Sequence, residues 1–118
     1  MIKKDIKTID ADGKTLGRVS TEIATSLMGK NSVNFQRHIY SGFPVKVINA
    51  KKLKITIKKL EQTVHANYSG HRGGLRMVKA IETVEKKGMK ELIKNAVYQM
   101  LPDNKLRREM MKHLIIND

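Results

Sequence analysis

The sequence predicts an α/β fold, and the order of its first three elements carries that prediction. Ile6–Ala11 alternates apolar and polar residues as a strand does, and apolar residues then recur at helical spacing from Leu16 to Leu27. Val45–Ala50 follows as a second strand. A strand, a helix and a strand in this order indicate a parallel pair. Because no repeat or linker divides the chain, we expect a single domain over residues 1–118.

Turn residues separate these elements. Asp12-Gly13 follows the first strand with turn chemistry, and Gly29 suits the left-handed position after the helix. The passage from Lys30 to Pro44 is basic and without periodicity, so we expect it to be irregular. The second strand is dense in apolar residues, which is typical of a strand buried on both faces.

The second half predicts a hairpin followed by helices. Leu53–Ile57 alternates as a strand, and Gln62–Ala66 is expected to return as its hairpin partner. Tyr68–Gly74 is then expected as an exposed loop. The helices are expected at residues 79–87, 89–100 and 105–113, with Gly88 between the first two.

Pro102 determines where the second of these helices ends. The residue before a proline is pushed out of the helical region, so the turn is set by covalent geometry. Lys105, Arg107 and Arg108 follow the turn and are predicted to face a polyanion. The last helix is expected to direct three apolar residues to the core. These residues are Leu106, Met110 and Leu114.

Charge narrows the classes of function. The chain has 24 lysines and arginines against 11 acidic residues, a formal net charge of +13 over 118 residues. Nucleic acid is the expected partner, because binding a polyanion relieves the repulsion between so many positive charges. A membrane surface is not expected, because the charge is not gathered on one amphipathic helix.

The cysteine count and the lengths of the apolar runs restrict the cellular compartment and the cofactors that we expect. The chain has no cysteine, which excludes disulfides and thiolate metal sites. No signal-peptide core follows Met1–Asp5, and no apolar run is long enough to span a membrane. We therefore expect a cytoplasmic or organellar protein.

The arginines are better candidates for phosphate contacts than the more numerous lysines, because a guanidinium group can grip a phosphate with two hydrogen bonds. They are Arg18, Arg37, Arg72, Arg76, Arg107 and Arg108. Aromatic residues are only 4% of the chain, so a sheet that stacks successive unpaired bases is not expected. Folded, largely helical RNA recognised by its shape is favoured.

Gly13-Lys14-Thr15 invites comparison with a nucleotide-binding phosphate loop. That loop requires a glycine five residues earlier, where Thr8 stands, so nucleotide hydrolysis is not expected. Instead, Lys14 and Arg18 flank the start of the first helix, where cations and free amides can jointly hold a backbone phosphate. The alternative is two solvated charges on a turn.

The loop Gly70-His71-Arg72-Gly73 matches a four-residue clamp of one RNA-binding module, but that module places it between two helices. Its chemistry still suits phosphate, because glycines admit a close approach while His71, Arg72 and Arg76 supply donors. The alternative is a plain flexible hairpin tip.

The remaining polar residues predict neither a metal site nor catalysis. The four histidines lack the close pairing of metal ligands, and His38, beside Arg37, is expected to face RNA or to cap a helix. Asp10, Asp12 and Glu22 form no arrangement of nucleophile, base and orienting group.

Several collinear blocks of the sequence resemble the motifs of one known family. Residues 10–18, DADGKTLGR, followed by Thr21-Glu22-Ile23-Ala24, are similar to that family's opening D-A-x-G-x-x-L-G-R-x-x-T-x-I-A. Residues 47–50, VINA, resemble its central strand, and residues 69–74, SGHRGG, its T-G-Y-x-G-G loop. Met100-Leu101-Pro102, with Leu106 and Arg108, resembles its M-L-P-x-x-x-L-G-R segment. The family that these blocks resemble is the bacterial type of large-subunit ribosomal protein L-thirteen.

The chain also departs from the family pattern. The usual N-terminal arm is much reduced and the tail is short. His71 replaces the loop tyrosine, Ala66-Asn67-Tyr68 replaces the usual Tyr-Arg-His, and Arg107 replaces a glycine. The differences at the two ends bear on contacts that the family makes through its extensions. Those at Tyr68, His71 and Arg107 bear on individual base contacts.

The resemblance implies a three-layer α/β/α domain with a mainly parallel four-stranded sheet, a basic hairpin loop and C-terminal helices. It also implies a non-enzymatic protein that binds large-subunit ribosomal RNA early in assembly, beside neighbouring ribosomal proteins and without cofactor, small-molecule substrate or membrane. The rivals are a free-standing RNA- or DNA-binding regulator and a small phosphate-handling enzyme. The expected RNA-binding residues are Lys14, Arg18, Lys30, Arg37, His38, Tyr68, Ser69, Gly70, His71, Arg72, Gly73, Gly74, Arg76, Lys79, Lys105, Arg107 and Arg108.

Overall fold

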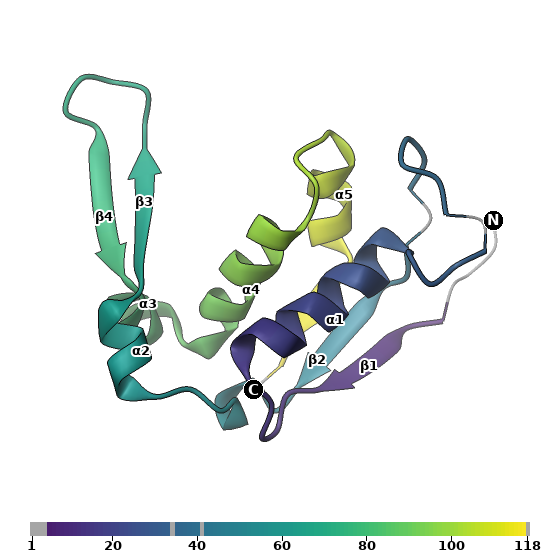
Figure 1. Ribbon diagram of the computed structural model, residues 1–118, viewed down its shortest axis with the longest axis horizontal. Helices are drawn as coiled ribbons and strands as arrows, with labels where there is room; N and C mark the ends of the chain where they lie inside the picture. The colour runs from purple at the N-terminus through teal and green to yellow at the C-terminus, as the bar shows by residue number, and fades with distance from the viewer. Residues whose placement is uncertain (1–4, 34, 41, 118) are drawn as a thin grey trace.

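The computed structural model describes residues 5–33, 35–40 and 42–117 (Figure 1). Residues 1–4, on which the expectation about a signal peptide rested, lie outside this part. The helices and strands confirm the α/β class. In chain order they are β1 (Lys7–Asp10), α1 (Leu16–Met28), β2 (Val45–Ile48), the short 3-10 helix η1 (Ala50–Lys52), α2 (Ile57–Gln62), β3 (Val64–Tyr68), β4 (Leu75–Lys79), α3 (Ala80–Lys87), α4 (Met89–Met100), α5 (Leu106–Lys112) and β5 (Leu114–Ile116).

The main sheet is parallel and has the strand order β1-β2-β5 in the described residues. Ile9 of β1 lies opposite Val47 of β2, and Val47 lies opposite Ile116 of β5. The expected parallel pair is therefore confirmed. The expectation that Leu114 belongs to the last helix is wrong, because it begins β5 and pairs with Val45.

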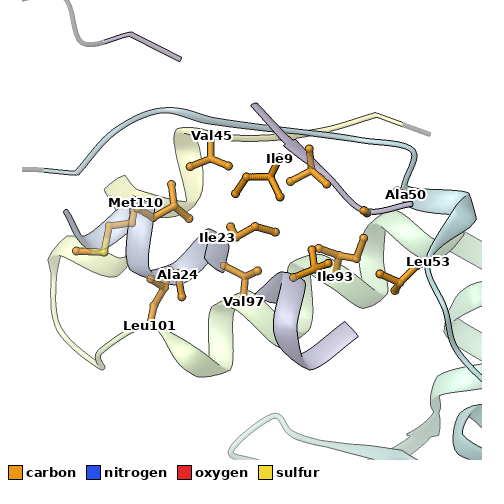
Figure 2. Packing of buried hydrophobic residues seen from close by; sticks show 14 residues of the cluster. Ile9, Ile23, Ala24, Val45, Ala50, Leu53, Ile93, Val97, Leu101 and Met110 are labelled. Carbon is orange, nitrogen blue, oxygen red and sulfur yellow. The ribbon is translucent and has the colours of Figure 1, made fainter. Parts of the chain in front are cut away.

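One face of this sheet holds the main core. Ile23 of α1 lies between the sheet and α4, with Ile9 above it and Val97 below it in Figure 2. The opposite face carries Thr8, Lys46 and Ile115 in one row, and Ile115 is 50% exposed. The prediction that β2 is buried on both faces is wrong for this outer face. The four-stranded sheet and the three layers are not confirmed.

The hairpin differs from the sequence prediction. Leu53–Ile57 is not a strand, since only Lys54 forms an isolated parallel bridge to Thr15 and α2 begins at Ile57. The helix starts there because the Thr56 hydroxyl accepts a hydrogen bond from the Lys59 amide at 3.3 Å. The true partner of β3 is β4, so the glycine-bearing loop is the tip of the hairpin.

A second, smaller cluster supports the hairpin. Leu60 of α2, Ala80 of α3 and Leu92 of α4 are buried together. The hairpin rises from this cluster and projects away from the sheet (Figure 1). The molecule is flat, with extents of 44 × 38 × 18 Å. In the described ranges, the helices are all too short or too polar to cross a membrane.

Candidate nucleic-acid interface

Three open clefts follow one another along the molecule and share lining residues. The turn cleft, about 410 Å³, lies between the loop after α1 and the turn after α4. The arginine cleft, about 750 Å³, lies between α4 and α5, and Asn104 lines both of these. The hairpin cleft, about 590 Å³, lies between the hairpin and helices α3 and α4, and it shares Tyr98 with the arginine cleft. Neighbouring clefts therefore adjoin at these shared residues, and the three together form a tract.

The arginine cleft is strongly basic. Its described lining has a single carboxylate, from Glu109, against five cationic side chains. These cations are Lys94, Lys105, Arg107, Arg108 and Lys112. The structure thus brings together the three cations predicted after Pro102 and adds Lys94 and Lys112, which sequence reasoning missed. Their signal was present, because both are polar positions on the outer faces of two amphipathic helices.

Arg107 is held in place by three contacts. Its guanidinium lies 3.9 Å from the centroid of the Tyr98 ring, and its Nη2 donates a hydrogen bond to the Tyr98 hydroxyl at 2.8 Å. The same nitrogen forms an ion pair with Asp103 at 3.0 Å. Only 20% of the Arg107 side chain is exposed. Arg107 therefore organises the cleft, whereas Arg108 is exposed beside it.

Asn104 fixes the start of α5. Its side-chain oxygen accepts hydrogen bonds from the amides of Leu106 at 3.0 Å and Arg107 at 3.2 Å. The side chain thereby satisfies two amides that the first turn of a helix leaves unpaired. This cap sets the direction in which the paired arginines leave the turn.

We expect Asn104→Ala to lower the free energy of unfolding by about 1 kcal/mol, because the two capped amides lose their acceptor. Asn104→Asp is the matched control, since its carboxylate keeps an acceptor at the same position. Urea denaturation of both variants and the parent chain measures the difference. Equal stability of the alanine variant and the parent would show that the cap contributes nothing.

The turn cleft combines cations with an apolar wall. Lys30 and Arg37 line it beside Phe35, Ile39 and Pro102. Residues from two distant parts of the sequence thus meet here, and both predicted site residues, Lys30 and Arg37, come from the loop after α1. His38 is exposed in the same loop but does not line the cleft.

The hairpin tip is exposed and depends on its glycines. Gly70 and Gly73 have φ values of 89° and 73°, which glycine adopts without strain. At Gly74 an added Cβ would collide with the Ser69 hydroxyl. His71 and Arg72 are both exposed at this tip. The predicted loop residues therefore lie together, with their backbone accessible.

The two faces of the hairpin differ in character. Asn67 and Arg76 lie opposite each other, and His65 pairs with Val78 on the same face. The other face exposes an apolar stripe that sequence reasoning missed, although the alternation of both strands marks it. The stripe consists of Val64, Tyr68, Leu75 and Met77, and Lys79 ends the same face.

Lys14 and Arg18 lie apart from this tract. Lys14 forms an ion pair with Glu22 at 3.4 Å, and Arg18 lines a separate open hollow with Lys59 of α2. Nearby, the Asn49 amide and the Asp12 backbone amide donate hydrogen bonds to the Asp10 carboxylate at 3.0 and 2.9 Å. The Asn49 bond, followed by the Asp12 bond, holds the pKa of Asp10 below its usual value. Lys14 and Arg18 are therefore accompanied by the carboxylates of Glu22 and Asp10 and stand outside the three clefts.

The described side chains offer no group of three or more histidine or acidic residues that could hold a metal ion. The clefts and the hairpin present cations, exposed glycines and the Tyr98 ring. Such groups contact the phosphates and bases of nucleic acids in known complexes.

Comparisons with known proteins identify relatives of this chain. A family model described as ribosomal protein L13 matches residues 4–117. The large ribosomal subunit protein uL13 of Alkaliphilus oremlandii is 46% identical over 106 residues, which cover 90% of this chain and 73% of the relative. The uL13 protein of Syntrophotalea carbinolica is 43% identical over 113 residues, 96% of this chain and 79% of the relative. That of Geobacter sp. is 44% identical over 115 residues, 98% and 80% respectively.

Proposed function

The chain belongs to the ribosomal protein L13 family, and from this membership we propose that it binds large-subunit ribosomal RNA through the three clefts and the hairpin. It is a structural constituent of the large ribosomal subunit in the cytoplasm and not an enzyme. Neighbouring ribosomal proteins are its further expected partners. Entry early in subunit assembly is part of the proposal.

The arginine cleft is the observation that carries this proposal. Five cations converge there against a single carboxylate, and Arg107 is held rigid by its neighbours. Cations fixed before binding lose little conformational entropy when a phosphate arrives. The cleft therefore suits the place where two RNA segments approach and would otherwise repel each other.

The hairpin extends the proposed contact away from the body of the molecule. Its tip presents exposed glycine backbone beside Arg72, and Arg76 follows on β4. In Figure 1 the tip, the turn before α5 and the loop after α1 all point to the same side. We propose that RNA lies along this side, with Lys14 and Arg18 making a separate contact.

We also propose that residues 1–118 act as one domain. Helix α4 supports this view because it contributes to both apolar clusters, Ile93 to the main core and Leu92 to the smaller one. Leu16 of α1 also packs against both clusters, so α4 and the start of α1 together couple the hairpin to the sheet.

We expect the affinity for large-subunit RNA to fall at least about tenfold between 50 and 200 mM salt, because several phosphate contacts release counterions together. Filter binding over a salt series measures the slope of log affinity against log salt. Arg108→Ala should make that slope shallower by about 1, the share of one phosphate contact. A flat response would contradict phosphate neutralisation.

Sedimentation tests the proposed place of action. After a moderate salt wash, the protein should sediment with large ribosomal subunits of the cells that produce it. Recovery mainly in the ribosome-free fraction would overturn the structural role and favour the free-standing regulator.

A further inference from the structure

We propose that the Tyr98 ring is a stacking site for one unpaired nucleobase of the bound RNA. This inference rests on the proposed function and adds to it a site that reads a single base within an interface otherwise fitted to phosphates. Three observations carry it: the exposure of Tyr98 in the hairpin cleft, the contacts that support its ring, and the polar groups beside it.

One face of the ring is occupied, but much of the residue remains accessible. The Arg107 guanidinium covers one face at 3.9 Å from the centroid, yet Tyr98 remains 45% exposed. Tyr98 lines both the arginine cleft and the hairpin cleft, whereas Arg107 lines only the first of these two. The exposed part of Tyr98 is therefore available to a planar group that enters from the hairpin cleft.

The ring is fixed before any ligand arrives. Tyr98 is on α4, and its hydroxyl accepts the hydrogen bond from Arg107 at 2.8 Å. Arg107 is anchored in turn by Asp103 at 3.0 Å. A ring that is already immobile costs little entropy when a base stacks on it. A guanidinium on one face and a base on the other form a layered stack in which each planar group contacts the next.

The hairpin cleft beside the ring offers hydrogen-bonding groups for a base edge. Asn67, Asn95 and Gln99 line it with amide side chains, and His65 adds an imidazole. Amide groups carry both donors and acceptors and pair with the edges of bases. The arginine cleft on the other side of Tyr98 supplies cations for the flanking phosphates.

The base must be unpaired. Within an RNA double helix each base is covered above and below by its neighbours, whereas a base in a loop or bulge can turn outward and stack on an aromatic ring. The matching ligand is therefore a single extruded base.

Two substitutions separate stacking from the support of Arg107. Tyr98→Leu removes the ring, and we expect it to weaken binding to large-subunit ribosomal RNA by about tenfold. Tyr98→Phe keeps the ring and loses only the hydroxyl, so its affinity should stay within about twofold of the parent. The inference would be overturned if the Tyr98→Leu variant bound this RNA as tightly as the parent. It would also be overturned if the Tyr98→Phe variant lost as much affinity as the Tyr98→Leu variant. Circular dichroism verifies that both variants are folded.

A double-mutant cycle separates the contribution of stacking on the Tyr98 ring from the support that Tyr98 gives to Arg107. If Tyr98 served only to hold Arg107, then Tyr98→Leu would have no effect once Arg107→Met had been made. Stacking predicts that Tyr98→Leu still weakens binding severalfold in that background. Loss of the effect in the Arg107→Met background would overturn the inference.

Fluorescence gives a direct readout, because the chain has no tryptophan. In a Tyr98→Trp variant, large-subunit RNA should quench the emission and protect the indole from acrylamide. Ile57→Trp is the control, since Ile57 is 69% exposed on α2 and lines none of the three clefts. RNA binding with unchanged emission at position 98 would overturn the stacking site and leave the proposed function standing. Failure of the parent chain to bind this RNA would instead overturn the proposed function.

Discussion

Replacing Arg72 and Arg108 together by alanine should weaken binding to large-subunit ribosomal RNA about a hundredfold at physiological salt. Each charge-assisted contact to a phosphate in a shielded interface contributes about 1.5 to 3 kcal/mol, and the two side chains lie far enough apart to act independently. Arg72 is exposed at the hairpin tip and Arg108 lines the arginine cleft. Filter binding with purified RNA measures the loss.

The double change Lys54→Ala with Lys58→Ala is the charge-matched control. Both lysines are exposed, and neither lines one of the three clefts. A mobile surface lysine contributes only a fraction of a held arginine, so the control should lose less than about tenfold. Equal losses in the two double variants would show that net charge alone governs binding and that the sites have no special part.

Ile93→Ala should lower the free energy of unfolding by about 2 to 5 kcal/mol. The Ile93 side chain is fully buried in the main core, where it projects from α4 near Ala50 and Leu53 (Figure 2). Its removal leaves a cavity that the surrounding strands and helices cannot fill without moving. Because domains of this size are stable by only about 5 to 15 kcal/mol, the loss is a large share of the total. Urea or thermal unfolding measures it.

Two further variants serve as a control and as a comparison for the loss of stability in Ile93→Ala. Ile57→Ala removes an apolar side chain that is 69% exposed, and it should change stability by less than about 0.5 kcal/mol. Leu92→Ala empties the smaller cluster instead, so hydrogen exchange should quicken first in the hairpin and α3. Exchange that quickens equally in the main sheet would mean that the two clusters unfold as one unit.

The sequence predicted the elements whose periodicity is strong. Helix α1 and its end at Gly29, the parallel pair β1 and β2, and the break between α3 and α4 at Gly88 are confirmed. In each case a local rule and the tertiary packing favour the same structure. Glycines at positive φ mark both of these helix ends.

The errors lie where alternation in a short segment has two explanations. Leu53–Ile57 alternates, but the Thr56 cap and the burial of Leu60 make the following residues helical. The strand β5 is too short to show a period, and only its pairing with β2 defines it. Strand partners far apart in the sequence are settled by tertiary packing, which local pattern does not contain.

The sequence suggested which cations belong to the candidate site, but it did not show how they are arranged in space. Residue type alone pointed to Arg107 and Arg108, and to Lys30 and Arg37 in the irregular passage. The alignment of three clefts depends on where α5 and the loop after α1 come to rest. The support of Arg107 by Tyr98 was also out of reach, because the two residues are on different helices and meet only after Pro102 turns the chain.

The exposed hairpin affects the behaviour of the protein before it binds RNA. As described, β3 and β4 pair only with each other, which leaves both outer edges of this ribbon free. One face also shows Tyr68, Leu75 and Met77 to water. Unpaired edges beside exposed apolar side chains are templates for intermolecular strand pairing. We therefore expect the chain to aggregate more readily when it is made faster than the RNA that it binds, and binding of that RNA to reduce this tendency.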